Sequence, residues 1–272
     1  MGFMQKAVLK VMLILLVLLL NRQDALVLAA GNQPAIQTVH FSGYDWDVRP
    51  AEVGGPGPNH WDTHNVRVDK WGALHLKITQ QAGIWRCAEV YTKRAFGFGR
   101  YQFQVTGPID RMDRSVVFGL FNYPQPEIGP DGTNEIDIEY SHWGNPAYPL
   151  GNYTVYPAHS GLPPGSKTFP ITPGTPNTTQ SFVWQSGSVT FQSTAGQEKP
   201  AGQGFGLWKY APADSEQYVP QKPLPVHINL WLFAGTPPRG RQEIEVVVKK
   251  FTFTPASAVS ASVAASGSGT EL

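Results

Sequence analysis

The chain has 272 residues, 15% of them charged, and its formal net charge is +1. A balance this close to neutral supplies neither a basic surface for nucleic acid nor an acidic tail, so no nucleic-acid partner is expected. Hydrophobic residues make up 41% of the chain and aromatic residues 12%, which is enough to bury a core of ordinary size.

Glycine and proline are frequent, with 28 and 24 copies. Together they exceed the background of roughly 12% of residues without reaching the level typical of disordered chains. Combined with many aromatic and β-branched residues, they indicate short strands joined by rigid turns. This is the composition of an all-β domain.

Residues 1–30 have the features of a secretory signal peptide. Lys6 and Lys10 precede an uncharged run of ten residues from Val11 to Leu20, and small residues at Ala29-Ala30 suit a cleavage site. An uncleaved membrane anchor is the alternative, but a spanning helix needs about 20 apolar residues. We therefore expect a secreted protein, extracellular or periplasmic, without stable membrane association after cleavage.

Residues 31–255 predict a single β domain, because no ten-residue segment after residue 30 has a helical apolar period. Ten or more strands at this spacing predict a two-sheet sandwich or a barrel. Residues 157–180 form a connection long enough to be a functional loop near a cleft, and residues 256–272 predict a disordered tail. The predicted strands are Val39–Val48, Asn65–Asp69, Ala73–Ile78, Trp85–Thr92, Arg100–Thr106, Val116–Phe121, Glu135–Glu139, Asn152–Tyr156, Ser181–Trp184, Ser188–Phe191, Val226–Phe233 and Glu243–Phe253.

One predicted strand carries three carboxylates on one face. Glu135, Asp137 and Glu139 alternate with Ile136 and Ile138, and successive side chains of a strand point to opposite faces. The pattern alone fits three structures. It could be a solvated acidic strand, a catalytic carboxylate site, or a calcium site, although calcium usually also takes loop carbonyls as ligands.

Glycoside hydrolysis is the chemistry that two such carboxylates perform: one protonates the leaving oxygen while the other attacks or activates water. A retaining enzyme holds the two carboxyl groups about 5–5.5 Å apart, whereas positions i and i+4 of a flat strand lie about 13 Å apart at Cα. Glu135 and Glu139 can therefore cooperate only if the strand curves with this face concave. Asp137 between them could share a proton with a neighbour and separate the pKa values.

Two other sequence features give weaker evidence for a functional site. Cys87 is the single cysteine, so it forms no intramolecular disulfide, and a lone thiol is more often packed than reactive. His60 and His64 have the spacing of helical zinc ligands, but they lie in a turn-rich stretch and no glutamate follows His60, as a metalloprotease would require. We therefore expect no required cofactor, while a structural Ca²⁺ is an open alternative that no motif indicates.

Several segments in chain order resemble glycoside hydrolase family 16. They are the Glu-Val-Tyr-Thr-Lys of 89–93, the Phe-Gly-Phe-Gly-Arg-Tyr of 96–101, the Glu-Ile-Asp-Ile-Glu of 135–139, the hairpin strand 181–184 and the Asn-Leu-Trp of 229–231. The resemblance covers most of residues 39–254. It implies a two-sheet antiparallel jelly-roll sandwich with a concave substrate cleft, as in licheninases and plant xyloglucan enzymes.

The resemblance also implies roles for individual residues. Glu135 matches the nucleophile, Asp137 the assisting carboxylate and Glu139 the general acid/base. Trp231 would stack on an apolar sugar face, and Asn229 would bind hydroxyls. The expected substrate-binding residues are Glu89, Tyr91, Trp143, Asn229, Trp231 and Asn59.

The sequence departs from the family pattern at two positions. Licheninases often carry an arginine where this chain has Tyr91, and the disulfide partner that some of them provide for Cys87 is missing. We expect a monomer that hydrolyses β-1,4 or β-1,3 linkages of a β-glucan-like polysaccharide through a glycosyl-enzyme. The alternatives are a transglycosylase and a carbohydrate-binding jelly roll without activity.

Overall fold

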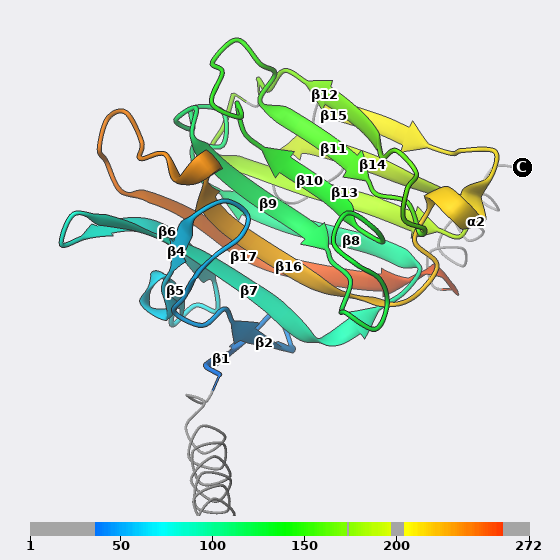
Figure 1. Ribbon diagram of the computed structural model, residues 1–272, viewed down its shortest axis with the longest axis horizontal. Helices are drawn as coiled ribbons and strands as arrows, with labels where there is room; N and C mark the ends of the chain where they lie inside the picture. The colour runs from blue at the N-terminus through cyan, green and yellow to red at the C-terminus, as the bar shows by residue number, and fades with distance from the viewer. Residues whose placement is uncertain (1–35, 173, 197–203, 258–272) are drawn as a thin grey trace, which may run out of the picture. The chain divides into compact units, whose positions relative to one another are not determined.

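The computed structural model of the protein describes residues 36–172, 174–196 and 204–257. The described residues from Gln37 onwards belong to one compact unit, and strands fill most of it (Figure 1). No helix among the described residues is long and apolar enough to cross a membrane. The predicted signal peptide and residues 258–272 of the predicted tail lie outside the described residues, so both stay predictions.

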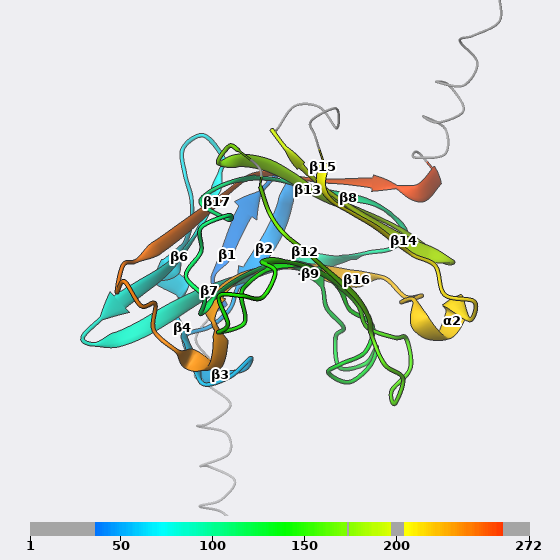
Figure 2. The same cartoon turned by 90° about the horizontal axis from the view of Figure 1, so that it is seen from above.

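The strands form two antiparallel sheets stacked face to face, which Figure 2 shows from above. The front sheet contains, in order of pairing, β1 (Thr38–Phe41), β2 (Tyr44–Val48), β7 (Ile84–Phe96), β16 (Leu224–Leu232), β9 (Val116–Asn122), β10 (Ile136–Tyr140), β11 (Gly151–Val155) and β12 (Gly165–Phe169). The back sheet contains β5 (Val66–Val68), β6 (Leu74–Gln81), β17 (Ile244–Pro255), β8 (Gly99–Thr106), β13 (Asn177–Gln185), β14 (Ser188–Ala195) and β15 (Gly204–Tyr210).

Short elements connect and flank the two sheets. The first part of β7 pairs with β6, which links front to back, and β4 (Asn59–Trp61) runs parallel to β7 beside β3 (Val53–Gly54). Helical elements are few and short: η1 (Thr63–Asn65), α2 (Ser215–Tyr218) and η2 (Phe233–Gly235) lie in the connections between strands. The predicted all-β jelly-roll sandwich is therefore confirmed.

The core between the sheets follows from the alternation of side chains. Ile136 and Ile138 of β10 are fully buried in the core, as are Ile228 and Leu230 of β16. Aromatic rings fill much of the remaining volume; Tyr101 of β8 stacks on Phe182 with ring centroids 4.5 Å apart. Because each front strand sends one set of side chains inward, the other set must line the outer face of the front sheet.

Two sequence predictions are wrong in detail. The segment predicted as one strand, Val39–Val48, is the hairpin of β1 and β2, and Ser42 and Gly43 have φ of 53° and 82° in its turn. Two positive-φ residues are what a two-residue hairpin turn requires. The predicted loop 157–180 contains β12, which pairs with β11, and none of its described residues lines the front-sheet cleft.

Candidate active site

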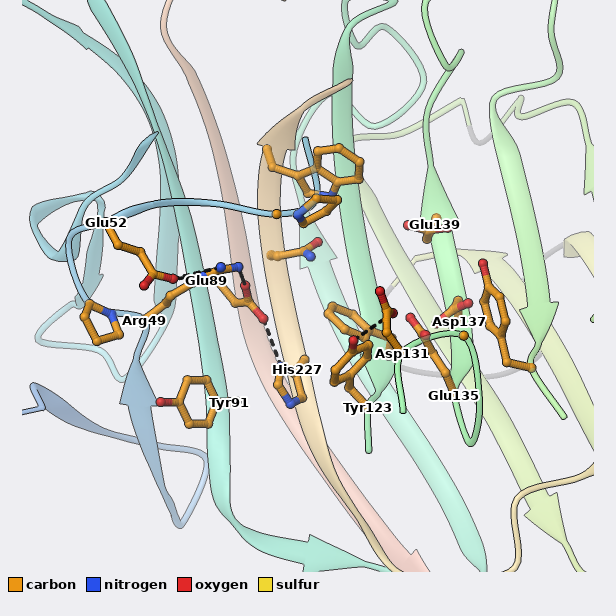
Figure 3. Close-up of a pocket in the computed structure, with 18 of the residues that line it drawn as sticks. Arg49, Glu52, Glu89, Tyr91, Tyr123, Asp131, Glu135, Asp137, Glu139 and His227 are labelled. Carbon is orange, nitrogen blue, oxygen red and sulfur yellow. Dashed lines mark hydrogen bonds and ion pairs between the residues drawn. The ribbon is translucent and has the colours of Figure 1, made fainter. Parts of the chain in front are cut away.

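A cleft with a volume of about 670 Å³ opens on the outer face of the front sheet. Its floor is built by alternate residues of four neighbouring strands, β7, β16, β9 and β10, and Figure 3 shows these side chains rising from one face. The lining residues are Arg49, Pro50, Glu52, Gly55, Pro56, Glu89, Tyr91, Phe121, Tyr123, Asp131, Gly132, Glu135, Asp137, Glu139, Trp143, Tyr156, His227, Asn229 and Trp231.

The three carboxylates of the acidic strand all line this cleft. Asp137 is buried, whereas Glu135 and Glu139 are partly exposed. Figure 3 shows the three along one strand on the same side of the sheet. The alternation predicted from the sequence is confirmed, because the isoleucines between them pack into the core.

Strand register places further groups beside these carboxylates. Glu139 lies opposite Gly119 of β9, and Gly119 lies opposite Asn229 of β16, which in turn pairs with Glu89 of β7. A Cβ at Gly119 would lie 2.5 Å from Asn229 Oδ1. The missing side chain at position 119 therefore gives the Asn229 amide its place on the cleft floor, between Glu89 and Glu139.

All three carboxyl groups hold protons more tightly than isolated acids. Burial and the charge of Glu139 raise the pKa of Glu135 to about 8, and burial raises the pKa of Glu139 to about 7. Burial and its two charged neighbours raise the pKa of Asp137 well above its ordinary value.

Within this triad, a hydrogen bond between Asp137 and Glu135 lowers the pKa of Glu135 and raises that of Asp137. This hydrogen bond favours a proton on Asp137 over one on Glu135, but the pKa of Glu135, about 8, still lies above that of Glu139, about 7. The triad therefore carries more than one proton at neutral pH and releases its protons in steps as the pH rises. A carboxylate and a carboxylic acid then face the same cleft, which is the pairing that acid-assisted displacement requires.

Glu89 is the opposite case, a buried carboxylate held ionised. Although burial opposes its charge, the contacts of His227 and Arg49 lower its pKa. His227 Nδ1 lies 2.9 Å from Glu89 Oε1, and Arg49 Nη1 lies 2.8 Å from Glu89 Oε2. Position 91 is a tyrosine rather than an arginine in this chain. The cation beside Glu89 is Arg49 instead, which directly follows β2. Figure 3 marks both contacts.

Two tryptophans form one wall of the cleft. Trp231 is 6% exposed, and its ring meets Trp143 at a centroid distance of 6.2 Å and an angle of 62°. Trp143 has a φ of 50° in the turn that follows β10, a conformation that costs a bulky residue free energy and occurs in turns and at functional sites. Since so little of Trp231 is exposed, it does not offer a full ring face to a ligand.

Three buried polar atoms of cleft residues have no hydrogen-bond partner among the described residues. They are Asp137 Oδ1, Asn229 Oδ1 and Trp231 Nε1. A buried polar atom without a partner costs roughly 1–3 kcal/mol. Such atoms clustered along a cleft indicate a site whose hydrogen bonds are completed when a ligand binds.

The structure thus brings eight of the nine predicted site residues to one cleft. The exception is Asn59, which is 2% exposed. Its amide donates to the Pro56 and Leu232 carbonyls, and its oxygen accepts from Cys87 Sγ at 3.3 Å. Asn59 therefore lies behind the lining residues and holds the backbone of the cleft wall in place through these hydrogen bonds. Burial also raises the pKa of the Cys87 thiol to about 12, so this thiol is inert.

Sequence reasoning missed several lining residues. His227 lies two positions before Asn229 on the same strand, and Phe121 and Tyr123 continue the alternation that begins at Gly119, so period-two counting could have found all three. Arg49 offered no such signal, because its partner Glu89 is 40 residues away.

No protein-family model matches the sequence, and no curated protein matches it. Solved structures do. A Bacillus licheniformis β-glucanase is similar over 82% of this chain and 94% of its own, at 20% identity and a TM-score of 0.55. A mixed-linkage glucan GH16 protein from Bacteroides ovatus, solved in complex with a product, is similar over 77% of this chain and 94% of its own, at 11% identity and a TM-score of 0.60.

A third solved structure agrees with these two. A β-1,3-glucanase from Mycobacterium marinum is similar over 77% of this chain and 90% of its own, at 16% identity and a TM-score of 0.57. The resemblance stated from the sequence motifs is thereby confirmed for the fold. The chain has the jelly-roll fold of the β-glucanases, a glycoside hydrolase of family 16 among them.

Proposed function

We propose that the protein is a retaining endo-glycosidase of glycoside hydrolase family 16 that hydrolyses a β-glucan-like polysaccharide. The single observation that carries the proposal is the carboxylate triad Glu135, Asp137 and Glu139, which begins directly before β10 and lines one cleft. The pKa values of Glu135 and Glu139, about 8 and about 7, let both groups hold a proton near neutral pH, and the motif match assigns Glu135 as the nucleophile and Glu139 as the acid. The β-glucanase fold supports the same assignment.

In the first step, a Glu135 oxygen attacks the anomeric carbon while the bond to the leaving oxygen breaks. Glu139 gives its proton to that oxygen, so the departing chain leaves as a neutral alcohol. Asp137, protonated beside Glu135, stabilises the nucleophile in its ionised form through their hydrogen bond.

In the second step, water attacks the anomeric carbon of the glycosyl-enzyme. Glu139, now a carboxylate, takes the proton of this water, and the bond to Glu135 breaks. Two successive displacements at one carbon leave its configuration unchanged. Both glutamates then return to their starting protonation states.

The rest of the cleft suits a neutral sugar chain. Asn229 and Trp231 offer an amide and an indole N–H for hydroxyl groups, and aromatic rings suit the apolar faces of sugar units. Arg49, the one lysine or arginine among the described lining residues, is already paired with Glu52 and Glu89 at 2.8 Å.

The proposal is tested by assaying the protein on mixed-linkage β-glucan, laminarin, xyloglucan and galactans, with reducing ends as the readout. We expect hydrolysis of at least one glucan, with Glu135→Gln and Glu139→Gln each reduced by at least about 10³-fold, in line with losing a catalytic group. His40→Asn, an exposed substitution on β1, is the control. Binding without cleavage on every polymer would contradict the proposal, and transfer to added oligosaccharide acceptors would identify a transglycosylase.

A further inference from the structure

His227 is the cleft residue whose geometry the catalytic steps leave unexplained. It lies on β16 opposite Phe121 of β9, and Asp137 of β10 lies on the other side of Phe121 in the same register. Two strand spacings of about 4.8 Å separate the backbones of His227 and Asp137. The imidazole is thus next to the reacting centre, but too far away to take part in it.

The orientation of this imidazole is fixed by Glu89. Glu89 is held ionised, so it accepts hydrogen bonds only, and Nδ1 of His227 must be the donor in their 2.9 Å contact. Nε2 is then a hydrogen-bond acceptor in the neutral ring and a donor in the protonated ring. Either form can bind a sugar hydroxyl, which both donates and accepts.

Glu89 is itself held in place from the other side. Arg49 contacts Glu89 at 2.8 Å and Glu52 at 2.8 Å, and its guanidinium lies over the Trp61 ring, 4.1 Å from the centroid. The chain of contacts therefore runs from a buried tryptophan through Arg49 and Glu89 to His227. Such a chain fixes a binding group in advance and lowers the entropy cost of binding.

Three aromatic rings confine the imidazole as well. Tyr91 stacks on it with centroids 5.2 Å apart and planes 22° apart, and Phe121 and Tyr123 approach to 5.1 Å and 5.6 Å. The His227 side chain nevertheless keeps 13% exposure and lines the cleft. No hydrogen bond involving Nε2 is described, so this atom is available to a ligand.

We infer that His227 is a specificity-determining residue whose Nε2 binds a hydroxyl of the sugar unit adjacent to the one attacked by Glu135. The inference rests on the proposed glycosidase function and adds to it a subsite on the β16–β7 side of the cleavage point. Glu89 and Arg49 act there as positioning residues, because Glu89 fixes the orientation of His227 and Arg49 holds Glu89 in place.

The test uses His227→Asn in the full chain. The asparagine amide nitrogen replaces Nδ1 and keeps the bond to Glu89, while no atom replaces Nε2. The probes are aryl β-glucosides of increasing chain length, with the linkage of the best polymer and a fluorescent leaving group. We expect unchanged kinetics on the shortest probe and a fall of roughly tenfold in kcat/KM, mainly through KM, once the probe reaches the subsite.

The outcomes separate binding from structure. An equal loss of kcat/KM on every probe length, or no loss on any probe, would overturn the inference about His227. The proposed function would still stand in either case if the wild type hydrolysed the probes and Glu135→Gln did not. Absence of hydrolysis by the wild type would overturn both. Glu89→Gln tests the positioning role: it should reproduce the length-dependent loss, and an unchanged length profile would contradict that role. His40→Asn, the same change at an exposed histidine, should leave every probe unaffected.

Discussion

Replacing Glu139 by glutamine should abolish activity and at the same time stabilise the protein at alkaline pH. Burial raises the pKa of this carboxyl from 4.5 to about 7. A raised folded-state pKa favours the protonated acid, so its contribution to stability is complete below pH 4.5 and is lost as the pH rises through 7. Glutamine is neutral at every pH, so the variant does not lose stability through ionisation at this position.

The size of the effect follows from the shift. Each pKa unit corresponds to about 1.4 kcal/mol, so ionising Glu139 in the folded protein costs up to about 3 kcal/mol at pH 9. For a domain of this size, 1 kcal/mol shifts Tm by about 2–4 °C. The variant should therefore melt about 6–12 °C above the wild type at pH 9, with the difference shrinking towards pH 5.

Denaturant unfolding and thermal melting of both proteins from pH 5 to pH 9 measure this difference. Glu216→Gln, at an exposed position of α2, is the control, and it should change the free energy of unfolding by less than about 0.5 kcal/mol. A variant no more stable than the wild type at pH 9, or a difference that does not grow with pH, would refute the reasoning.

Three further predictions concern the cleft. Because the pKa values of Glu139 and Glu135 are about 7 and about 8, the share of enzyme with Glu135 ionised and Glu139 protonated is largest between pH 7 and pH 8. The kcat/KM of the wild type should therefore fall about tenfold per pH unit above pH 8; a flat profile up to pH 10 would contradict these roles. Gly119→Ala places a Cβ 2.5 Å from Asn229 Oδ1 and should raise KM about tenfold, which corresponds to a loss of about 1.4 kcal/mol in binding free energy. The control is Gly187→Ala, in a hairpin turn with nothing within 4 Å of the added Cβ, and it should leave KM unchanged. Arg49→Ala should lower the free energy of unfolding by about 2 kcal/mol at pH 7, because Glu89 is left with His227 alone; urea titrations showing no loss would contradict the importance of this pair.

The local elements of the fold were largely predictable, because alternation is a property of each strand by itself. Ile136 and Ile138 are in the core and the carboxylates between them are in the cleft, as period two requires. The hairpin at Ser42-Gly43 was missed because β-branched and aromatic residues continue on both sides of the turn. β12 was missed because proline and glycine surround it and only its pairing with β11 makes it a strand.

The site was predictable where its residues share a strand and unpredictable where they meet through the fold. Asn229 and Trp231 follow from a short motif, whereas the meeting of Arg49 with Glu89 depends on β2 lying beside β7. Asn59 shows the converse error. An asparagine placed near a cleft by sequence position is buried behind the wall and holds two carbonyls there.

The central claim is that Glu135 forms a covalent bond to the sugar. A 2-deoxy-2-fluoro β-glucoside of the preferred linkage, with a good leaving group, slows both steps and should accumulate the glycosyl-enzyme. Intact mass and peptide mapping should find one added glycosyl group, carried by Glu135, and none on Glu135→Gln. A label on Glu139 or Asp137, or turnover of unmodified substrate with inverted anomeric configuration, would contradict the account.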